Sequence, residues 1–502
     1  MTWILAGAAL VAAGAAALRW LRVAQREHYL VGVSRFARMW WGFDIRNIAF
    51  LAGALVSAVA AAVAAAAGIV AVAIAVVGPL GLGLRGRTSR LAWTGRLRRL
   101  AAVVAAITLA VIAVAGLMDV PTLVAMVPLA VPLFVDGGLR LTAAFERRQG
   151  ERWVRQAAAC LARVDPTIVA ITGSYGKTST KNIVAHLLGG VRSVTASPAS
   201  FNNRMGLARA VNEHLAPGTD VFVAEMGTYG PGEIRDLCEW IPPDVAVITA
   251  LGPVHLERMG SIERIAAAKR EILDSAPVAV VSVDHPLLAA IAREEAGRRK
   301  VITVSGEGGA ADVVAGPDGV VAVGGALVGR FPPARAHPVN VACAVGVLVA
   351  LDVDPKETVG RLRDLPEVPH RRNLGRSARG FAIIDDTFNA NPAGAEAALE
   401  LLVQQGSPHG RKVVVSPGMV ELGERQEAAN HDFAVAAGRS GVTDFVVVNR
   451  TNREALVAGA REGGVGSVIV FDTRDDAVRW VRETLVEGDA VLYENDLPDH
   501  YP

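Results

Sequence analysis

The chain has 502 residues, which is enough for two or three domains that each bury a core. Its apolar fraction of 52% and its mean hydropathy of +0.35 are high for a purely soluble protein. The formal net charge of +2 hides an uneven distribution, because residues 1–150 hold 15 arginines, no lysine and five acidic residues, a net of +10, which leaves −8 for the rest. A purely soluble chain is therefore excluded, and a basic apolar part precedes an acidic α/β part.

The long apolar runs lie in residues 1–150. The run 3–18 is followed by arginines instead of preceded by them, which predicts an uncleaved anchor and not a signal peptide. The run 48–84 would reach about 55 Å as one helix, against a hydrocarbon core of about 30 Å, so it predicts a helical hairpin. The runs 100–118 and 121–135 predict two further spans, of which the second contains three prolines.

The arginine clusters between these runs indicate an orientation. Arginine is dense in 19–47, in 85–99 and in 140–148, and positive charge marks the cytoplasmic side of a membrane. All three clusters face the cytoplasm only if residues 1–150 cross five times, with the N-terminus outside. The sequence thus predicts a multi-pass protein of the cell membrane with membrane lipid as a partner. Basic loops between spans do not favour nucleic acid as a partner.

A phosphate-binding loop follows at residues 167–189, TIVAITGSYGKTSTKNIVAHLLG. A β-branched run enters a glycine-containing turn and a helical pattern leaves it, so backbone N–H groups and the helix N-terminus would face an anion. The lysine would reach the outer phosphates and the next hydroxyl would ligate Mg²⁺. The usual Walker A pattern would have Gly at position 171, where this chain has Ile. The candidate nucleotide-binding residues here are Gly173, Ser174, Gly176, Lys177, Thr178 and Ser179.

This loop variant, T-G-x-x-G-K-[TS]-[ST], resembles that of the Mur ligases, which join amino acids or peptides to a cell-wall precursor. Downstream stretches match the D-alanyl-D-alanine-adding branch of that family in order and spacing, over residues 165–450 or so. The resemblance implies an α/β fold: a central P-loop ATPase domain over 151–365 and a C-terminal Rossmann-like domain over 366–502. Both would follow an α-helical transmembrane module over 1–150.

Three residues of the central domain are candidates for metal binding beside Thr178. Glu225 ends an apolar strand, His255 lies in a loop after the next strand, and Lys269 lies on the apolar stripe of a helix that Ser261 would cap. The resemblance implies that Glu225 and His255 hold metal and that Lys269 is carbamylated by CO₂ and supports it. The implied cofactors are ATP and two Mg²⁺ ions.

Five apolar runs predict a second sheet in the C-terminal domain, at 381–384, 413–415, 445–448, 467–471 and 490–493. The string IIDDTFNANP at 383–392 resembles a family signature, which implies that Asp386 contacts the ribose or phosphate side of ATP and that Asn389 shapes the nucleotide pocket. Arg371 matches a residue that reaches the γ-phosphate, and GMVELGE at 418–424 also fits the branch. Asn340, with His337, resembles a nucleotide-edge motif, although Pro338 separates the usually adjacent pair.

These features predict an ATP-dependent amide ligase that acts through an acyl phosphate, with Lys177, Lys269, Arg371 and His255 as the catalytic candidates. The resemblance fails at both ends: the apolar module replaces the family's UDP-sugar-binding domain, and an acidic stretch at 488–502 replaces a basic, Gly-rich one. We therefore expect an amino acid or dipeptide to be joined to a membrane-carried precursor.

Three alternatives stay open at this point. The first is addition of D-alanyl-D-alanine to the UDP-linked muramyl tripeptide. The second is an amino-acid-polymerising ligase of the same superfamily. The third, of another class, is a membrane transport ATPase, which is disfavoured because the predicted spans contain no charged residue and no second nucleotide-binding half follows.

Overall fold

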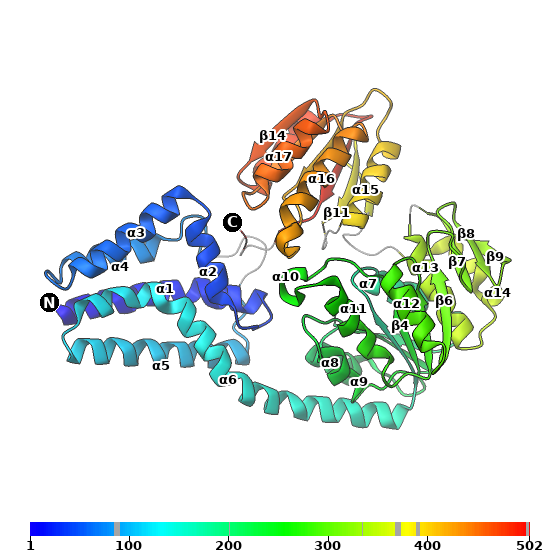
Figure 1. Ribbon diagram of the computed structural model, residues 1–502, viewed down its shortest axis with the longest axis horizontal. Helices are drawn as coiled ribbons and strands as arrows, with labels where there is room; N and C mark the ends of the chain where they lie inside the picture. The colour runs from blue at the N-terminus through cyan, green and yellow to red at the C-terminus, as the bar shows by residue number, and fades with distance from the viewer. Residues whose placement is uncertain are drawn as a thin grey trace. The chain divides into compact units, whose positions relative to one another are not determined.

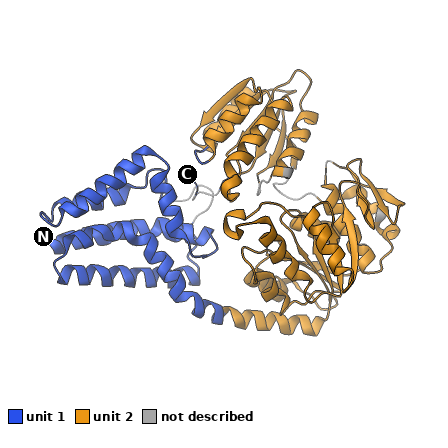
Figure 2. Ribbon diagram, in the orientation of Figure 1, with its two compact units in different colours: residues 1–149, 449–451, 497–502 blue, residues 150–448, 452–496 orange. Residues whose placement is uncertain are grey.

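The computed structural model describes residues 1–502 except 85–90, 200, 334, 367–372, 388–391, 498–500 and 502. The chain divides into two compact units (Figure 2). Unit 1 comprises residues 1–149, 449–451 and 497–502, and unit 2 comprises residues 150–448 and 452–496.

Unit 1 is built of helices (Figure 1). They are α1 (Thr2–Arg26), α2 (Val33–Gly42), α3 (Ile45–Ala60), α4 (Ala67–Val77), α5 (Gly95–Leu117) and α6 (Pro121–Val164), the last of which continues into unit 2. Within the described residues three of them, α1, α5 and α6, are long and apolar enough to cross a membrane. A fourth crossing results if α2 and α3, which meet at a bend of 108°, count as one.

The helical hairpin expected over 48–84 is present as α3 and α4, which pack against each other. Both are shorter than a full bilayer crossing requires, with 16 and 11 residues. The prediction of five spans therefore stays a prediction. The helix α6 is longer than the predicted span 121–135, since it runs for 44 residues through two internal prolines.

Two charged residues that border predicted spans are buried in unit 1 and cap helices there. The Arg19 guanidinium donates to the carbonyl of Val76 at 2.6 Å and to that of Gly78 at 3.2 Å, where α4 ends. The Asp136 carboxylate accepts N–H groups at the start of α2, including that of Val33 at 2.8 Å. Because a helix leaves carbonyls unpaired at its C-terminus and N–H groups at its N-terminus, both charges stabilise helix ends.

The first sheet of unit 2 has nine strands in the order β2-β3-β1-β4-β5-β6-β7-β8-β9. The pairs from β2 to β7 are parallel, and β8 and β9 close the edge as antiparallel strands. The strands are β1 (Thr167–Thr172), β2 (Val194–Ala196), β3 (Val221–Glu225), β4 (Val245–Ile248), β5 (Val278–Ser282), β6 (Lys300–Ser305), β7 (Val313–Ala315), β8 (Val320–Val323) and β9 (Ala326–Arg330).

Helices cover both faces of this sheet, which explains why its strands are apolar on both sides. Along β1, Ile168 and Ala170 enter one core while Val169 and Ile171 enter the other. The helices are α7 (Lys177–Leu188), α8 (Arg204–His214), α9 (Glu233–Cys238), α10 (Leu256–Met259), α11 (Ile262–Arg270), η1 (Glu271–Leu273), α12 (Pro286–Glu295), α13 (Pro338–Ala350), α14 (Pro355–Thr358) and η2 (Val359–Asp364).

The second sheet of unit 2 has six strands in the order β10-β11-β15-β12-β13-β14. All five predicted strands are confirmed within a residue or two at each end, and β10, which pairs antiparallel with β11, is an addition. The strands are β10 (Asn373–Arg376), β11 (Ala382–Asp386), β12 (Lys412–Ser416), β13 (Asp444–Val448), β14 (Ser467–Phe471) and β15 (Ala490–Glu494).

The two faces of this second sheet are covered unequally. One face packs on α15 (Pro392–Gln405), α16 (Gln426–Arg439) and α17 (Arg453–Glu462). The other face packs on α18 (Arg474–Thr484), which is the only helix with residues in that core among the described parts of the chain. The short helix η3 (Gly423–Arg425) precedes α16.

Candidate functional site

The loop 173–176 joins β1 to α7 and has a glycine with positive φ at each end. Gly173 and Gly176 have φ angles of +155° and +79°, which disfavour any residue with a side chain. A Cβ at Gly173 would also collide with the Thr249 hydroxyl, and one at Gly176 with the side-chain oxygen of Asn340. Both glycines are therefore required by the fold of the loop, as the sequence pattern predicts.

Hydrogen bonds to neighbouring elements hold this loop in place. The Ser174 hydroxyl donates to the carbonyl of Gly252 at 3.0 Å, and the Thr180 hydroxyl donates to the side chain of Asn340 at 3.4 Å. Asn340 is buried on α13, with 6% of its surface exposed. It contacts the loop itself, so a direct role at the nucleotide edge stays a prediction.

Lys177, the first residue of α7, is folded back over the loop. Its ammonium donates to the carbonyl of Gly173 at 2.8 Å and to that of Ser174 at 3.5 Å. The positive charge is thus held beside the loop N–H groups and not extended into solvent. An anion bound by those groups would meet this charge directly.

The carboxylate of Glu225 lies beside the loop because β3 is hydrogen-bonded to β1 in parallel register, so the two strands end at the same edge. Glu225 is 1% exposed. It accepts the Thr178 hydroxyl at 2.9 Å and the Asn202 amide at 3.2 Å. It also pairs with the ammonium of Lys181 at 3.2 Å, and that lysine is equally buried.

Lys269 lies on the core-facing side of α11, as its spacing predicts, and is 4% exposed. The helix begins after Ser261, whose hydroxyl accepts the N–H of Arg264 at 3.2 Å, which confirms the expected cap. Burial, together with the nearby Lys177 ammonium, holds the pKa of Lys269 well below its usual value. Among the described residues its amine has no hydrogen-bond or ion-pair partner, so the neutral form is favoured.

His255 pairs with a residue that the sequence analysis does not single out. Its Nδ1 lies 2.5 Å from the Glu421 carboxylate, and its ring contacts that of Tyr229 edge-on at 4.8 Å between centroids. His255 itself has φ +59°, the left-handed conformation, at the start of α10. The backbone turn and the carboxylate together fix the direction of the imidazole.

The candidate metal ligands do not form one cluster of ionisable groups. In the part of the chain that the structure describes, no three His, Cys, Asp or Glu side chains come together as a metal-binding group. Thr178 and Glu225 are in direct contact, whereas the side-chain contacts recorded for His255 are with Glu421 and Tyr229. A shared site for all the candidates stays a prediction.

For four more candidates the structure says little about a role. Asp386 is the last residue of β11, where its carbonyl accepts the N–H of Asn495 at 3.0 Å. Ser179 lies in the first turn of α7. Arg371 and Asn389 lie outside the described residues.

Sequence reasoning missed Lys181, Asn202 and Glu421. Lys181 could have been found, because it lies four residues after Lys177 on the same helix and so on the same face. Glu421 lies 166 residues from His255, and no local pattern reveals such a pairing.

Comparison with known families assigns two stretches of the chain. Residues 171–323 match the Mur ligase middle domain, and residues 370–493 match the Mur ligase, glutamate ligase domain. Together these stretches contain the loop, Glu225, His255, Lys269, Arg371 and the Asp386 signature.

Curated relatives match about two thirds of the chain. The chain is 33% identical over 368 residues to the UDP-N-acetylmuramoyl-tripeptide--D-alanyl-D-alanine ligase of Mycobacterium leprae (strain TN), which covers 65% of this chain and 70% of that protein. It is 34% identical over 354 residues to the protein of the same name from Mycobacterium tuberculosis (strain ATCC 25618 / H37Rv), with 65% and 67% covered.

Solved structures agree with these relatives. MurF from Acinetobacter baumannii superposes with a TM-score of 0.60 at 25% identity, covering 69% of this chain and 77% of that one. MurF ligase from Thermotoga maritima in complex with ADP superposes with a TM-score of 0.56 at 27% identity, covering 69% and 80%.

Proposed function

This chain belongs to the Mur ligase family and is an ATP-dependent amide-bond-forming ligase, and we propose that it joins D-alanyl-D-alanine to a UDP-linked muramyl tripeptide. One observation supports this substrate pair above the others. Curated relatives that match 65% of this chain at 33–34% identity are named for that reaction. The expectation of a membrane-carried precursor becomes the second candidate.

The residues present fit ATP with Mg²⁺. Glycines at positive φ leave room for phosphates where any Cβ would intrude on the loop's own contacts. The N–H groups of 173–176 and the Lys177 ammonium would hold the phosphates, and the oxygens of Thr178 and Glu225 are the hard ligands that Mg²⁺ prefers. Bound there, Mg²⁺ would supply charge neutralisation at the phosphate oxygens.

Lys269 and His255 complete the proposed metal side. A neutral buried amine is the form that attacks CO₂, and the depressed pKa of Lys269 favours that form. Its carbamate would replace a cation by an oxygen ligand. The Glu421 carboxylate would orient the His255 imidazole, as acidic partners do for metal-binding histidines.

The proposed chemistry has two steps. A substrate carboxylate oxygen attacks the γ-phosphorus of ATP and displaces ADP, which gives an acyl phosphate. The amine then attacks the acyl carbon, loses a proton and displaces phosphate, which gives the amide. Lys177 and Arg371 would stabilise the charge that develops on the transferred group, and no enzyme nucleophile is required.

A second candidate substrate is favoured by the N-terminal helices. The match to the Mur ligase domains begins at residue 171, and the helices α1 to α6 precede that point. A multi-pass module in the cell membrane, with the ligase domains in the cytoplasm, would suit a polyprenyl-linked glycopeptide as the carboxylate donor. Membrane lipid would then be a partner of this chain.

ADP release by detergent-purified protein tests both candidates. D-alanyl-D-alanine is offered with either the UDP-linked muramyl tripeptide or a lipid-linked muramyl peptide, and Lys177→Ala serves as the blank. We expect release with the UDP-linked tripeptide. Release with the lipid-linked peptide alone would replace the first candidate by the second, and release with neither would reject both.

A further inference from the structure

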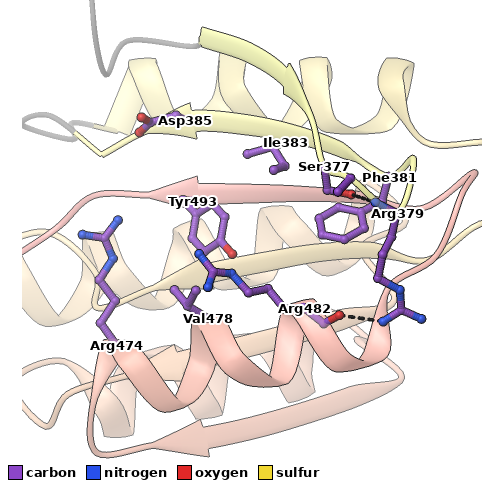
Figure 3. A pocket seen from close by; sticks show the side chains of 10 residues that line it. Ser377, Arg379, Phe381, Ile383, Asp385, Arg474, Val478, Arg482 and Tyr493 are labelled. Carbon is purple, nitrogen blue, oxygen red and sulfur yellow. Dashed lines mark hydrogen bonds between the residues drawn. The ribbon is translucent and has the colours of Figure 1, made fainter.

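A groove lies on the second sheet of unit 2, and no residue of the proposed ATP site lines it. It has a volume of about 600 Å³, which is within the range of small-molecule sites. Figure 3 shows the side chains that surround it. They are Ser377, Ala378, Arg379, Phe381, Ile383, Asp385, Arg474, Val478, Arg482 and Tyr493.

The geometry of a strand and a helix explains why these residues face one another. Alternate residues of a strand share a face, so Ile383 and Asp385 of β11 point the same way. Residues four apart on a helix share a face, so Arg474, Val478 and Arg482 form one stripe of α18. The groove lies between this stripe and the strand face, with Tyr493 of β15 at its floor (Figure 3).

The groove is open because α18 covers only part of its sheet face. Its buried residues Ala477 and Val481, and Leu485 directly after it, belong to one core with residues of β12 and β13. Of the helices in the described chain, α18 alone contributes to this core, and its main strand contacts are with β13 and β14, at the other side of the sheet from β11. The floor of the groove is accordingly apolar and aromatic.

The three arginines of the groove differ in their hydrogen-bond and ion-pair partners. The guanidinium of Arg379 donates to the carbonyls of Arg482 and Glu483 at 2.6 and 2.9 Å, so it caps the end of α18. Arg474 pairs with Asp496 at 2.5 Å at the surface. The Arg482 guanidinium has no hydrogen-bond or ion-pair partner among the residues that the structure describes.

Tyr493 places a hydroxyl beside one of these arginines, Arg482. Burial raises the pKa of its hydroxyl, and the positive charges of Arg474 and Arg482 act in the opposite direction. Figure 3 shows the guanidinium of Arg482 beside this hydroxyl, and that of Arg474 on the side of the ring away from the hydroxyl. The result is a positively charged end with a hydrogen-bonding hydroxyl above an apolar floor.

We propose that this groove binds a phosphate or diphosphate ester, with its oxygens on Arg482 and the Tyr493 hydroxyl and its organic part on the apolar floor. Guanidinium groups bind phosphate oxygens through paired N–H donors, and Arg482 is available for this. Asp385 lies toward the same end of the groove as Arg474, away from the Arg482 guanidinium and the Tyr493 hydroxyl.

The assignment of a natural ligand rests on the proposed function. UDP-linked and polyprenyl-linked precursors share a diphosphate ester, and they differ in whether a planar base or an apolar chain is attached. Either group would suit the floor. The groove would thus hold the carrier end of the precursor.

The test uses two variants of α18 that remove the same charge. Arg482→Gln removes the unpaired groove guanidinium. Arg479→Gln is the matched control, because Arg479 lies three residues earlier, does not line the groove and pairs with Asp476 at the surface. Both side chains are exposed, so neither change should affect folding.

Binding is measured by titration calorimetry on the detergent-purified full chain, with a non-hydrolysable ATP analogue and Mg²⁺ occupying the loop 173–176. The probes are inorganic diphosphate, UDP and geranyl diphosphate, with protein-free micelles as the blank. We expect UDP or geranyl diphosphate to bind more tightly than inorganic diphosphate. Arg482→Gln should weaken that binding at least tenfold, and Arg479→Gln less than twofold.

Tyr493→Phe is a second variant, which removes one hydroxyl and should weaken binding several-fold. The proposal is overturned if no probe binds the unaltered protein, or if Arg482→Gln and Arg479→Gln bind equally. Tight binding of inorganic diphosphate alone would also overturn the ester assignment. These results do not depend on ligase activity, so they separate failure of the groove from failure of the proposed function.

Discussion

At the scale of single residues, the carboxylate of Glu225 is a buried charge in the central domain that needs a counter-charge. It is buried beside Lys181 and is also hydrogen-bonded to Thr178 and Asn202. Separate removal of either charge would leave the other buried without its counter-charge. The lysine therefore supplies the counter-charge that holds the carboxylate in place next to the nucleotide loop.

Lys181→Met should destabilise the protein by about 3 kcal/mol, because it leaves Glu225 buried without its ion-pair partner. Thermal unfolding followed by circular dichroism would measure this. The double variant Lys181→Met with Glu225→Leu should recover much of the loss. A single variant as stable as the unaltered protein would contradict the assigned role.

The buried amine of Lys269 should make the stability of the protein depend on pH. Its pKa is lower in the folded state than in the unfolded state. Between these two pKa values the unfolded state binds more protons than the folded state. The stability of the protein therefore rises with pH up to about 10.5. Lys269→Met removes the cost of the buried amine. The variant should therefore melt at a higher temperature than the unaltered protein at pH 7, with the difference shrinking near pH 10.5.

This comparison requires buffers depleted of CO₂, because a carbamate would remove the free amine. In ¹³C-labelled bicarbonate the unaltered protein should show a carbamate resonance that Lys269→Met lacks. The variant should also lose ligase activity. A melting difference that is the same at both pH values would contradict the burial argument.

At the scale of elements, the loop 173–176 and helix α13 must fit each other. Gly176 has φ +79° and its missing side chain leaves the space that Asn340 occupies. The nucleotide site therefore depends on a helix that begins more than 160 residues later in the chain.

Gly176→Ala should cost about 1 kcal/mol for the left-handed backbone, with a further cost for the contact with Asn340. We expect at least tenfold weaker binding of an ATP analogue, measured by calorimetry. Adding Asn340→Ala should relieve the steric part and leave the backbone part. Gly218→Ala, at a similar φ of +81° with open space around it, is the matched control.

The sequence was sufficient to predict features that depend on a local pattern of residues. The strands β11 to β15 follow from β-branched runs, and the buried position of Lys269 follows from its helical spacing. Features that depend on which distant segments meet were not predictable. The pairing of His255 with Glu421 and the groove beside α18 both join segments that lie far apart in the sequence.

At the scale of the whole molecule, α6 belongs to both units. Its residues 121–149 lie in unit 1, and its last turns place Val154, Ala157 and Leu161 in a core of unit 2. These three residues lie on one helical face. The boundary between the units therefore falls inside a continuous helix and not in a loop.

A chain that begins at Gly150 should fold and stay soluble without detergent, because it keeps those three residues. A chain that begins at Pro166 should be less stable by roughly 4 kcal/mol, since it exposes the core they cover. Thermal unfolding compares the two. The full chain should sediment with lipid vesicles and the shorter chain should not, and sedimentation of both would contradict the membrane assignment of unit 1.

The strand order of the second sheet has a consequence for protein synthesis. The strand β15 lies between β11 and β12, yet the ribosome makes it after all five other strands of the sheet. Until then β11 and β12 each lack a partner on that side, so the sheet cannot close while its chain is still emerging. Helices α15 to α18 are made in that interval, and the domain should complete its folding only after β15 has left the ribosome.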